Sequence, residues 1–124
     1  MKCLIFVTAH SCRSQLERLT RILVSAFPGS TIYRHSDMLR VPHDVLNNKV
    51  DAVFLEAEMG KMNGLDLIQS LHGQKPELSL FIISATEEFR RKAVELGANG
   101  YFVLPESEEH LLETMRLAIT KVNA

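Results

Sequence analysis

The sequence contains little cysteine, almost no net charge and no long hydrophobic run. Its two cysteines, Cys3 and Cys12, fall in a predicted strand and a predicted helix, and without further cysteines to build a framework both are expected to be free thiols. A net charge of −1 gives no general reason for binding nucleic acid or membrane. The first apolar run, residues 3–7, is too short to span a membrane and lacks a small-residue cleavage pattern, so we expect a cytoplasmic protein.

Sequence motifs for catalysis are absent as well. No glycine-rich phosphate loop follows the first predicted strand and no Ser/His/Asp set stands at strand ends, so nucleotide binding and hydrolase chemistry have no support. Cys12 and Arg18 match the C-x5-R spacing of tyrosine phosphatases, but Leu16 and Leu19 give these residues a helical pattern, whereas the phosphatase loop wraps phosphate with backbone amides. We therefore expect no enzyme activity and no cofactor.

What is present indicates one globular domain of 124 residues, with 46% hydrophobic and 23% charged residues. Five runs of strand-forming residues alternate with five helical patterns, which predicts a parallel sheet with right-handed crossovers and helices on both faces. The predicted strands are residues 2–7, 31–35, 50–55, 79–84 and 101–104, and the helices that follow them begin near residues 11, 42, 63, 87 and 107.

The apolar positions in the helices predict which side chains reach the core. In the short helix that begins near Pro42, Val45 and Leu46 are expected to face inward. The last two helices each leave one large apolar residue, Val94 and Leu117, outside their core-facing stripes. Those stripes run through Phe89, Ala93 and Leu96 in helix 87–96, and through Leu111, Met115, Ala118 and Val122 in the last helix.

The chain is organised around the stretch from Val50 to Gly64, V-D-A-V-F-L-E-A-E-M-G-K-M-N-G. Its apolar run, residues 53–55, predicts a buried strand, and Asn63 predicts the cap of the next helix. Glu56 follows the strand directly. Because open parallel sheets place their ligand crevice at the carboxyl ends of the strands, Glu56 is the first candidate for a functional residue.

This stretch resembles the middle of response-regulator receiver domains, which run roughly D-hydrophobic-hydrophobic-hydrophobic-D-x-x-M-P-x-M-x-G. A second match is G-A-N-G-Y-F-V-L-P at residues 97–105, similar to the family's G-A-x-x-Y-x-x-K-P. The resemblance spans essentially the whole chain. It implies a flavodoxin-like α/β fold: a doubly wound, five-stranded parallel sheet of strand order 2-1-3-4-5, with a crevice between the ends of strands one and three.

In receiver domains the second aspartate accepts a phosphoryl group from a histidine kinase, two acids after the first strand hold a divalent cation, and a lysine precedes the proline. The matching positions here are Glu56, then Thr8 and Ala9, and finally Leu104. Alanine has no ligand atom and leucine cannot pair with a phosphoryl group, so the resemblance implies a degenerate receiver, or pseudo-receiver, without a magnesium site. His10 is a candidate ligand for a softer metal, but a lone histidine is more often a surface residue, and we expect no metal site.

The resemblance also implies that two positions through which receivers transmit their signal are retained, Ser84 and Tyr101. Each has an alternative interpretation: Ser84 caps the following turn, and Tyr101 is an ordinary strand residue. Glu56 has three interpretations. It is phosphorylated despite the missing charges, it mimics the phosphorylated state by a fixed charge toward Ser84, or it is a solvated carboxylate, which we favour.

These features predict a phosphorylation-independent receiver domain that acts as a protein-interaction module in signal transduction. One alternative is a constitutively active-like receiver, the input half of a transcriptional regulator whose output domain would follow Ala124. Another is a small flavodoxin-like enzyme or flavin-binding protein, because one architecture hosts many functions.

The expected interface surrounds the fifth strand. Val94 and Leu117 bracket Tyr101 and the charged run Arg90-Arg91-Lys92. Because a few apolar anchors with a charged rim suit a protein interface, we expect a partner protein, or a second copy in a homodimer, to bind helix 87–96, strand 101–104 and the last helix. We expect no membrane partner, and nucleic acid only through a downstream output domain.

Overall fold

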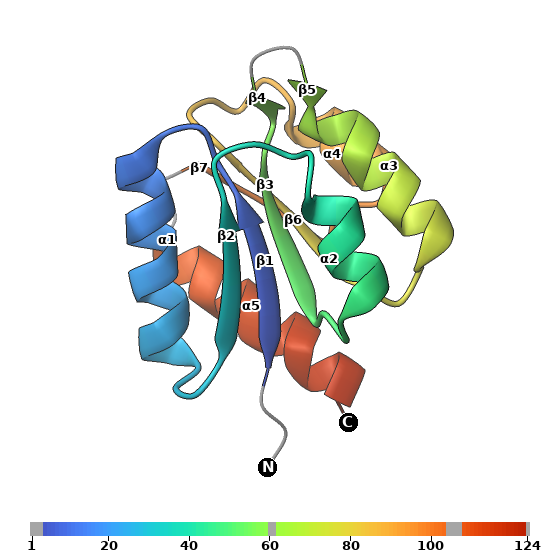
Figure 1. Ribbon diagram of the computed structural model, residues 1–124. Coiled ribbons are helices and arrows are strands. Elements are labelled where there is room, and N and C mark those ends of the chain that lie inside the picture. Colours follow the sequence, from blue (N-terminus) through green and yellow to red (C-terminus); the bar gives the residue numbers. More distant parts are fainter. Residues whose placement is uncertain (1–3, 60–61, 104–107, 124) are drawn as a thin grey trace.

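The computed structural model describes residues 4–59, 62–103 and 108–123, which are built around a five-stranded parallel sheet (Figure 1). Its strands are β1 Ile5–Ala9, β2 Thr31–His35, β3 Ala52–Glu56, β6 Ser79–Ser84 and β7 Gly100–Val103. The helices are α1 Arg13–Ala26, α2 Val41–Asn47, α3 Gly64–Gln74, α4 Arg90–Glu95 and α5 Glu108–Asn123. The spatial order β2-β1-β3-β6-β7 is the predicted order 2-1-3-4-5, so the predicted fold class is confirmed.

Each face of the sheet has its own apolar core, because successive strand residues point to opposite faces. Helices α2, α3 and α4 cover one face, and α1 and α5 cover the other (Figure 1). Under α1 and α5, four phenylalanines from neighbouring strands stand side by side, with ring centroids 6.0, 5.0 and 5.9 Å apart along the series Phe6, Phe54, Phe81 and Phe102. Burial on both faces explains why the strands are almost continuously apolar.

The register between β1 and β3 decides which residues meet at the carboxyl edge of the sheet. At the start of the pair, Ile5 N–H donates to Asp51 Oδ2 at 2.8 Å, and Asp51 N–H donates to the Ile5 carbonyl at 2.8 Å. At its end, Ala9 pairs with Leu55. The residues that follow, His10 and Glu56, therefore leave the sheet at the same level.

Strand β1 ends at Ala9, two residues later than predicted. The strand continues through Thr8 because β2 and β3 pair with it on both sides, with Thr8 opposite Arg34 and Phe54. Residues at the expected start of this strand, including Cys3, lie outside the described residues, as does Leu104 at the expected end of the fifth strand. Among the described residues Cys12 is an exposed free thiol, as expected.

The helices depart from the prediction at two points. Leu46 is 66% exposed and was wrongly expected in the core: α2 has only seven residues, and it buries Val41 and Val45, which stand one turn apart. Helix α4 begins at Arg90, not at residue 87, because Arg90 N–H closes a turn on the Glu87 carbonyl at 3.1 Å.

Gly73 and Pro76 indicate in the sequence where α3 stops, and the helix ends between them, at Gln74. The predicted stripe of α5 is buried at Leu111 and Met115, whereas the side chains of Ala118 and Val122 lie outside the description. A short antiparallel pair that the sequence did not predict, β4 Glu58–Met59 and β5 Met62–Asn63, stands at the carboxyl edge of the sheet (Figure 1). No helix within the described ranges combines the length and apolar character that crossing a bilayer requires.

Candidate functional site

Glu56 closes β3 at the carboxyl edge of the sheet, and the loop after β1 holds its carboxylate. Oε1 accepts hydrogen bonds from Ser11 N–H at 3.0 Å and from the Ser11 hydroxyl at 2.6 Å. Oε2 lies 3.7 Å from His10 Nε2. The Glu56 side chain is only 20% exposed. It is therefore a hydrogen-bonded, partly buried carboxylate, less solvated than the favoured interpretation expected.

The start of α3 packs against the backbone of Glu56. Gly64 N–H donates to the Ala57 carbonyl at 2.9 Å, and a Cβ at Gly64 would lie 2.1 Å from the Glu56 carbonyl oxygen. No side chain fits at that distance, so glycine is required where helix and strand approach each other. The predicted cap is present as well, because Asn63 Oδ1 accepts from Leu65 N–H at 2.8 Å.

His10 is buried, with 7% exposure, so the expectation of a surface histidine was wrong. Cys12 N–H donates to its Nδ1 at 3.0 Å, which leaves the neutral ring with its proton on Nε2, facing Glu56. Burial lowers the pKa of His10, and the nearby Glu56 carboxylate opposes that shift. The ring is thus favoured as a neutral donor toward Glu56.

The two positions that would hold a cation in a receiver, Thr8 and Ala9, both lie inside β1. Ala9 packs in the apolar core under α2 and α3, and the Thr8 hydroxyl is buried without a hydrogen-bond partner among the described residues. Within the same ranges, no three His, Cys, Asp or Glu side chains gather as a metal site requires. Neither Thr8 nor Ala9 adds an oxygen ligand beside Glu56.

Ser84 and Tyr101 meet at the backbone of Thr86. Ser84, the last residue of β6, accepts a hydrogen bond from Thr86 N–H at 3.2 Å, so its hydroxyl caps the following turn. The Tyr101 side chain is buried, and its hydroxyl donates to the Thr86 carbonyl at 2.5 Å. Phe89 N–H lies within 3.4 Å of the same hydroxyl. Tyr101 therefore ties the loop after β6 to the edge strand β7.

The candidate interface residues differ in their exposure and in the contacts that they already make. Val94 is 57% exposed and Leu117 is 69% exposed, as predicted. Arg90 is engaged: it pairs with Glu87 at 2.5 Å, and its guanidinium lies 5.1 Å from the Tyr101 ring centroid. Arg91 pairs with Glu95 at 3.4 Å on the exposed side of α4. The apolar anchors are thus exposed, whereas Tyr101 is 1% exposed, so the expectation that it contacts a partner directly was wrong.

The phosphatase-like spacing from Cys12 to Arg18 has no structural counterpart. Residues from Arg13 onward are helical in α1, so no loop is present to wrap a phosphate group, as the leucine spacing predicted. The buried side chains of Leu19, Ile22 and Leu23 hold that helix on the sheet.

Ser11 is the site residue that the sequence analysis missed. The first helix was expected to begin near residue 11, yet Cys12 occupies the N-cap position of α1 and the Ser11 hydroxyl binds Glu56. The register of the two central strands carries the missing information, because it places the residues after Ala9 next to the residue after Leu55.

The match to a known family covers Glu56 and most of the fold. Residues 12–116 match the family described as the response regulator receiver domain. The chain belongs to the response-regulator receiver family. It is thus a receiver domain of two-component signal transduction, and receiver domains interact with signalling partners.

Curated relatives of this receiver are longer than the chain. Response regulator MprA of Mycobacterium sp. (strain KMS) is 26% identical over 113 residues, which cover 90% of this chain and 48% of that protein. Sensory transduction protein LytR of Staphylococcus epidermidis is 30% identical over 79 residues, covering 64% of this chain and 30% of that protein. The chain therefore spans about half the length of MprA, and its match covers a smaller share of LytR.

Solved receiver structures share the fold over nearly the whole length. The signal receiver domain of an HD domain-containing protein from Pseudomonas fluorescens Pf-5 superposes with a TM-score of 0.86 at 21% identity, covering 98% of both chains. A CheY-like receiver domain protein from Methanospirillum hungatei JF-1 gives a TM-score of 0.83 at 16% identity, with the same coverage. At these identities the likeness concerns the fold alone.

Proposed function

We propose that this receiver works without phosphorylation, as a protein-interaction module and not as an enzyme. The observation that carries the proposal is the engagement of Glu56: Oε1 accepts two hydrogen bonds from Ser11, and Oε2 faces His10. A carboxylate that attacks a phosphoryl group needs a free oxygen and nearby cations that neutralise the transferred charge. In Glu56, Oε1 is occupied by Ser11, and Oε2 faces a histidine that is favoured in its neutral form and not a cation.

The surroundings of Glu56 support the same conclusion. Thr8 and Ala9 lie in β1, and Ala9 packs in the core, so neither supplies the carboxylate oxygens that magnesium prefers. Without that cation, phosphoryl transfer lacks a stabilising term of several kcal/mol. Glutamate also carries its carboxylate one methylene further from the strand than the aspartate of the family pattern.

The contacts weigh against Glu56 as a mimic of the phosphorylated state. Such a mimic would act on Ser84, but within the described residues Glu56 is bonded toward β1, and the Ser84 hydroxyl accepts from Thr86 N–H. The input half of a constitutively active-like regulator therefore ranks second. The longer relatives are compatible with an output domain beyond this chain, and any nucleic-acid binding would belong to such a domain.

The partner surface we propose surrounds the edge strand β7. Helices α4 and α5 flank this strand on opposite faces of the sheet (Figure 1), and each exposes one apolar anchor, Val94 and Leu117. Charged side chains, including Arg91, surround the anchor on α4. A second copy or a signalling protein would bury these anchors and leave the charges at the rim.

Incubation with acetyl phosphate and magnesium tests the central claim. Intact-mass spectrometry is expected to show no phosphate-sized gain for the wild-type protein, nor for Glu56→Asp, because neither supplies the missing cation ligands. A phosphorylatable receiver of intact motif serves as the positive control. A gain in the wild-type protein that disappears in Glu56→Gln would overturn the proposal.

A further inference from the structure

A groove between α1 and α5 gathers three arginines, and no carboxylate among the described residues lines it. It encloses about 420 Å³ and is lined by Arg18, Arg21, Ile22, Ser25, Ala26, Leu112 and Arg116. We propose that this groove binds a phosphorylated metabolite of nucleotide size. The proposal concerns the face of the sheet under α1 and α5 and does not depend on the function proposed for Glu56.

The three arginines lack the ion pairs that other arginines of this chain make. Within the described residues, none of Arg18, Arg21 and Arg116 pairs with a carboxylate, and no carboxylate lines the groove. Elsewhere the exposed arginines with a glutamate one helical turn away do pair: Arg13 with Glu17, Arg90 with Glu87 and Arg91 with Glu95. The chain as a whole carries a net charge of −1, so three positive charges around one hollow are a local concentration. An anion bound there would relieve their mutual repulsion.

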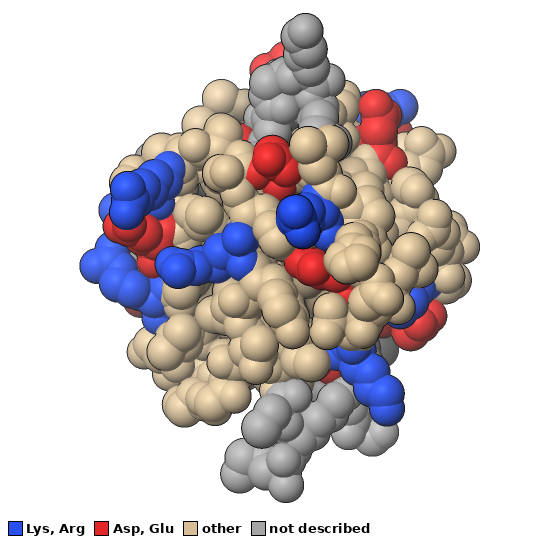
Figure 2. Space-filling model, in the orientation of Figure 1, with Lys and Arg blue, Asp and Glu red and all other residues tan. Residues whose placement is uncertain are grey.

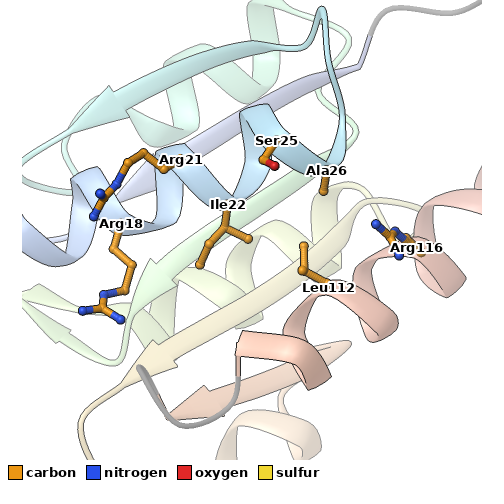
Figure 3. Close-up of a pocket in the computed structure, with 7 residues that line it drawn as sticks. All are labelled: Arg18, Arg21, Ile22, Ser25, Ala26, Leu112 and Arg116. Carbon is orange, nitrogen blue, oxygen red and sulfur yellow. The ribbon is translucent and has the colours of Figure 1, made fainter.

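Apolar side chains form the floor of the groove, and arginines stand at its two ends (Figure 3). In Figure 3, Arg18 and Arg21 extend from α1 at one end of the groove, Arg116 extends from α5 at the other, and Ile22 and Leu112 lie between them. Guanidinium groups match phosphate oxygens by paired N–H donors. The apolar middle suits a flat or carbon-rich portion of a ligand, and Ser25 offers a hydroxyl beside it. Charge at the ends and apolar surface between them describe a phosphorylated organic molecule better than a bare inorganic ion.

The limits of the positive region favour a compact ligand over an acidic protein segment. Along α5 the groove meets a second hollow of about 320 Å³ that shares Leu112 and Arg116 but is also lined by Glu109 and Glu113. An acidic helix that continued along α5 would approach these two carboxylates. A volume of about 420 Å³ lies within the range of small-molecule sites. Figure 2 shows Lys and Arg side chains over α1 and the neighbouring β2, with an acidic side chain among them.

No sequence motif marks this site. Arg18 and Arg21 are neighbours because residues three apart share one side of a helix, but Arg116 joins them only when α1 and α5 pack on the same face of the sheet. Backbone phosphate loops, whose absence argued against nucleotide binding, are not involved. The recognition proposed here is carried by side chains alone.

Calorimetric titration of the purified chain with metal-free ATP and with tripolyphosphate tests the proposal. ATP is expected to bind saturably with a Kd below about 1 mM. It should bind tighter than tripolyphosphate, because only ATP has a portion for the apolar floor. Arg18→Gln, Arg21→Gln and Arg116→Gln should each weaken ATP binding about tenfold, the expected loss of one charged hydrogen-bonding group. Arg13→Gln is the matched control: it removes the same charge from α1 outside the groove, and its effect should stay within about twofold.

Several results would overturn the proposal. These are no saturable binding of ATP, equal losses in Arg13→Gln and in the groove variants, or equal affinity for ATP and tripolyphosphate. Tighter binding of a single-stranded DNA oligonucleotide than of ATP, lost in the same three variants, would assign the arginines to nucleic acid instead. Because all three replaced side chains are at least partly exposed, circular dichroism melting is expected to match the wild type and would exclude unfolding as the cause.

Discussion

The Tyr101 hydroxyl donates a hydrogen bond of 2.5 Å to the carbonyl oxygen of Thr86. The N–H of Thr86 donates a second hydrogen bond, of 3.2 Å, to the hydroxyl oxygen of Ser84. One peptide segment thus connects the two receiver positions that the sequence retains, at the end of β6 and in β7. Because Thr86 makes both bonds, a movement of the loop after β6 at this residue would disturb the contacts of Ser84 and of Tyr101.

Replacing Tyr101 with Phe should loosen that loop while the core stays packed. The ring remains buried, but the Thr86 carbonyl loses its donor, and a loss of about 1 kcal/mol in the free energy of unfolding is expected. Hydrogen exchange should accelerate in residues 85–89 more than in the sheet. Tyr33→Phe, which removes a 3.3 Å hydrogen bond to Asn48, is the control. Unchanged exchange in that loop would show that the bond does not restrain it.

The attachment of Glu56 to Ser11 should appear as a coupling energy. In a double-mutant cycle of Ser11→Ala and Glu56→Ala, the two losses should be non-additive by about 1 kcal/mol, because either change removes the same 2.6 Å hydrogen bond. Urea unfolding of the four proteins provides the measurement. Ser14→Ala with Glu56→Ala is the control cycle, since the Ser14 hydroxyl contacts Cys12. Additive losses for Ser11 and Glu56 would mean that in solution the two side chains bond to water and not to each other.

Stability should depend on pH through His10. Burial lowers its pKa in the folded protein, so the unfolded chain takes up a proton at His10 at a higher pH than the folded chain does. Since the unfolded state then binds more protons, the free energy of unfolding should fall as the pH drops below about 6.5, the ordinary histidine pKa. The stabilising contribution is fully present above that pH.

His10→Asn should flatten this dependence, because asparagine can still accept from Cys12 N–H but does not titrate. Denaturant unfolding at a series of pH values, with a parallel NMR titration of the imidazole, provides the measurement. The exposed His43 provides the control variant, His43→Asn. A His10 pKa above the ordinary value would show that attraction to Glu56 outweighs burial.

Partner binding should depend on the two apolar anchors beside β7. Val94→Glu and Leu117→Glu place a charge on residues that are 57% and 69% exposed, so the fold should persist while self-association or partner binding weakens. Sedimentation tests self-association, and pull-down of a candidate signalling partner tests binding. Leu46→Glu is a matched control, since Leu46 is 66% exposed on α2. If all three variants behaved like the wild type, the surface around β7 would be ruled out.

The sequence determined the sheet and its helices because their patterns are local. Apolar runs such as residues 79–84 are buried on both faces as expected, and the match at residues 97–105 correctly indicated the receiver order of strands. Helix faces were predictable where spacing repeats over several turns, as with Leu19 and Leu23 in α1. In α2, a helix of seven residues, adjacent Val45 and Leu46 offered no such repeat, and only packing on the sheet decided which was buried.

Tertiary structure alone decided what surrounds Glu56 and where the arginines gather. The sequence placed Glu56 at a strand end, but the β1–β3 register brought His10 and Ser11 to its carboxylate, and burial of His10 followed from that arrangement. Likewise Arg18 and Arg116 are 98 positions apart and share a groove only because two helices pack on one face of the sheet. Such contacts depend on register and packing between distant segments, and neither is encoded in the periodicity of any single segment.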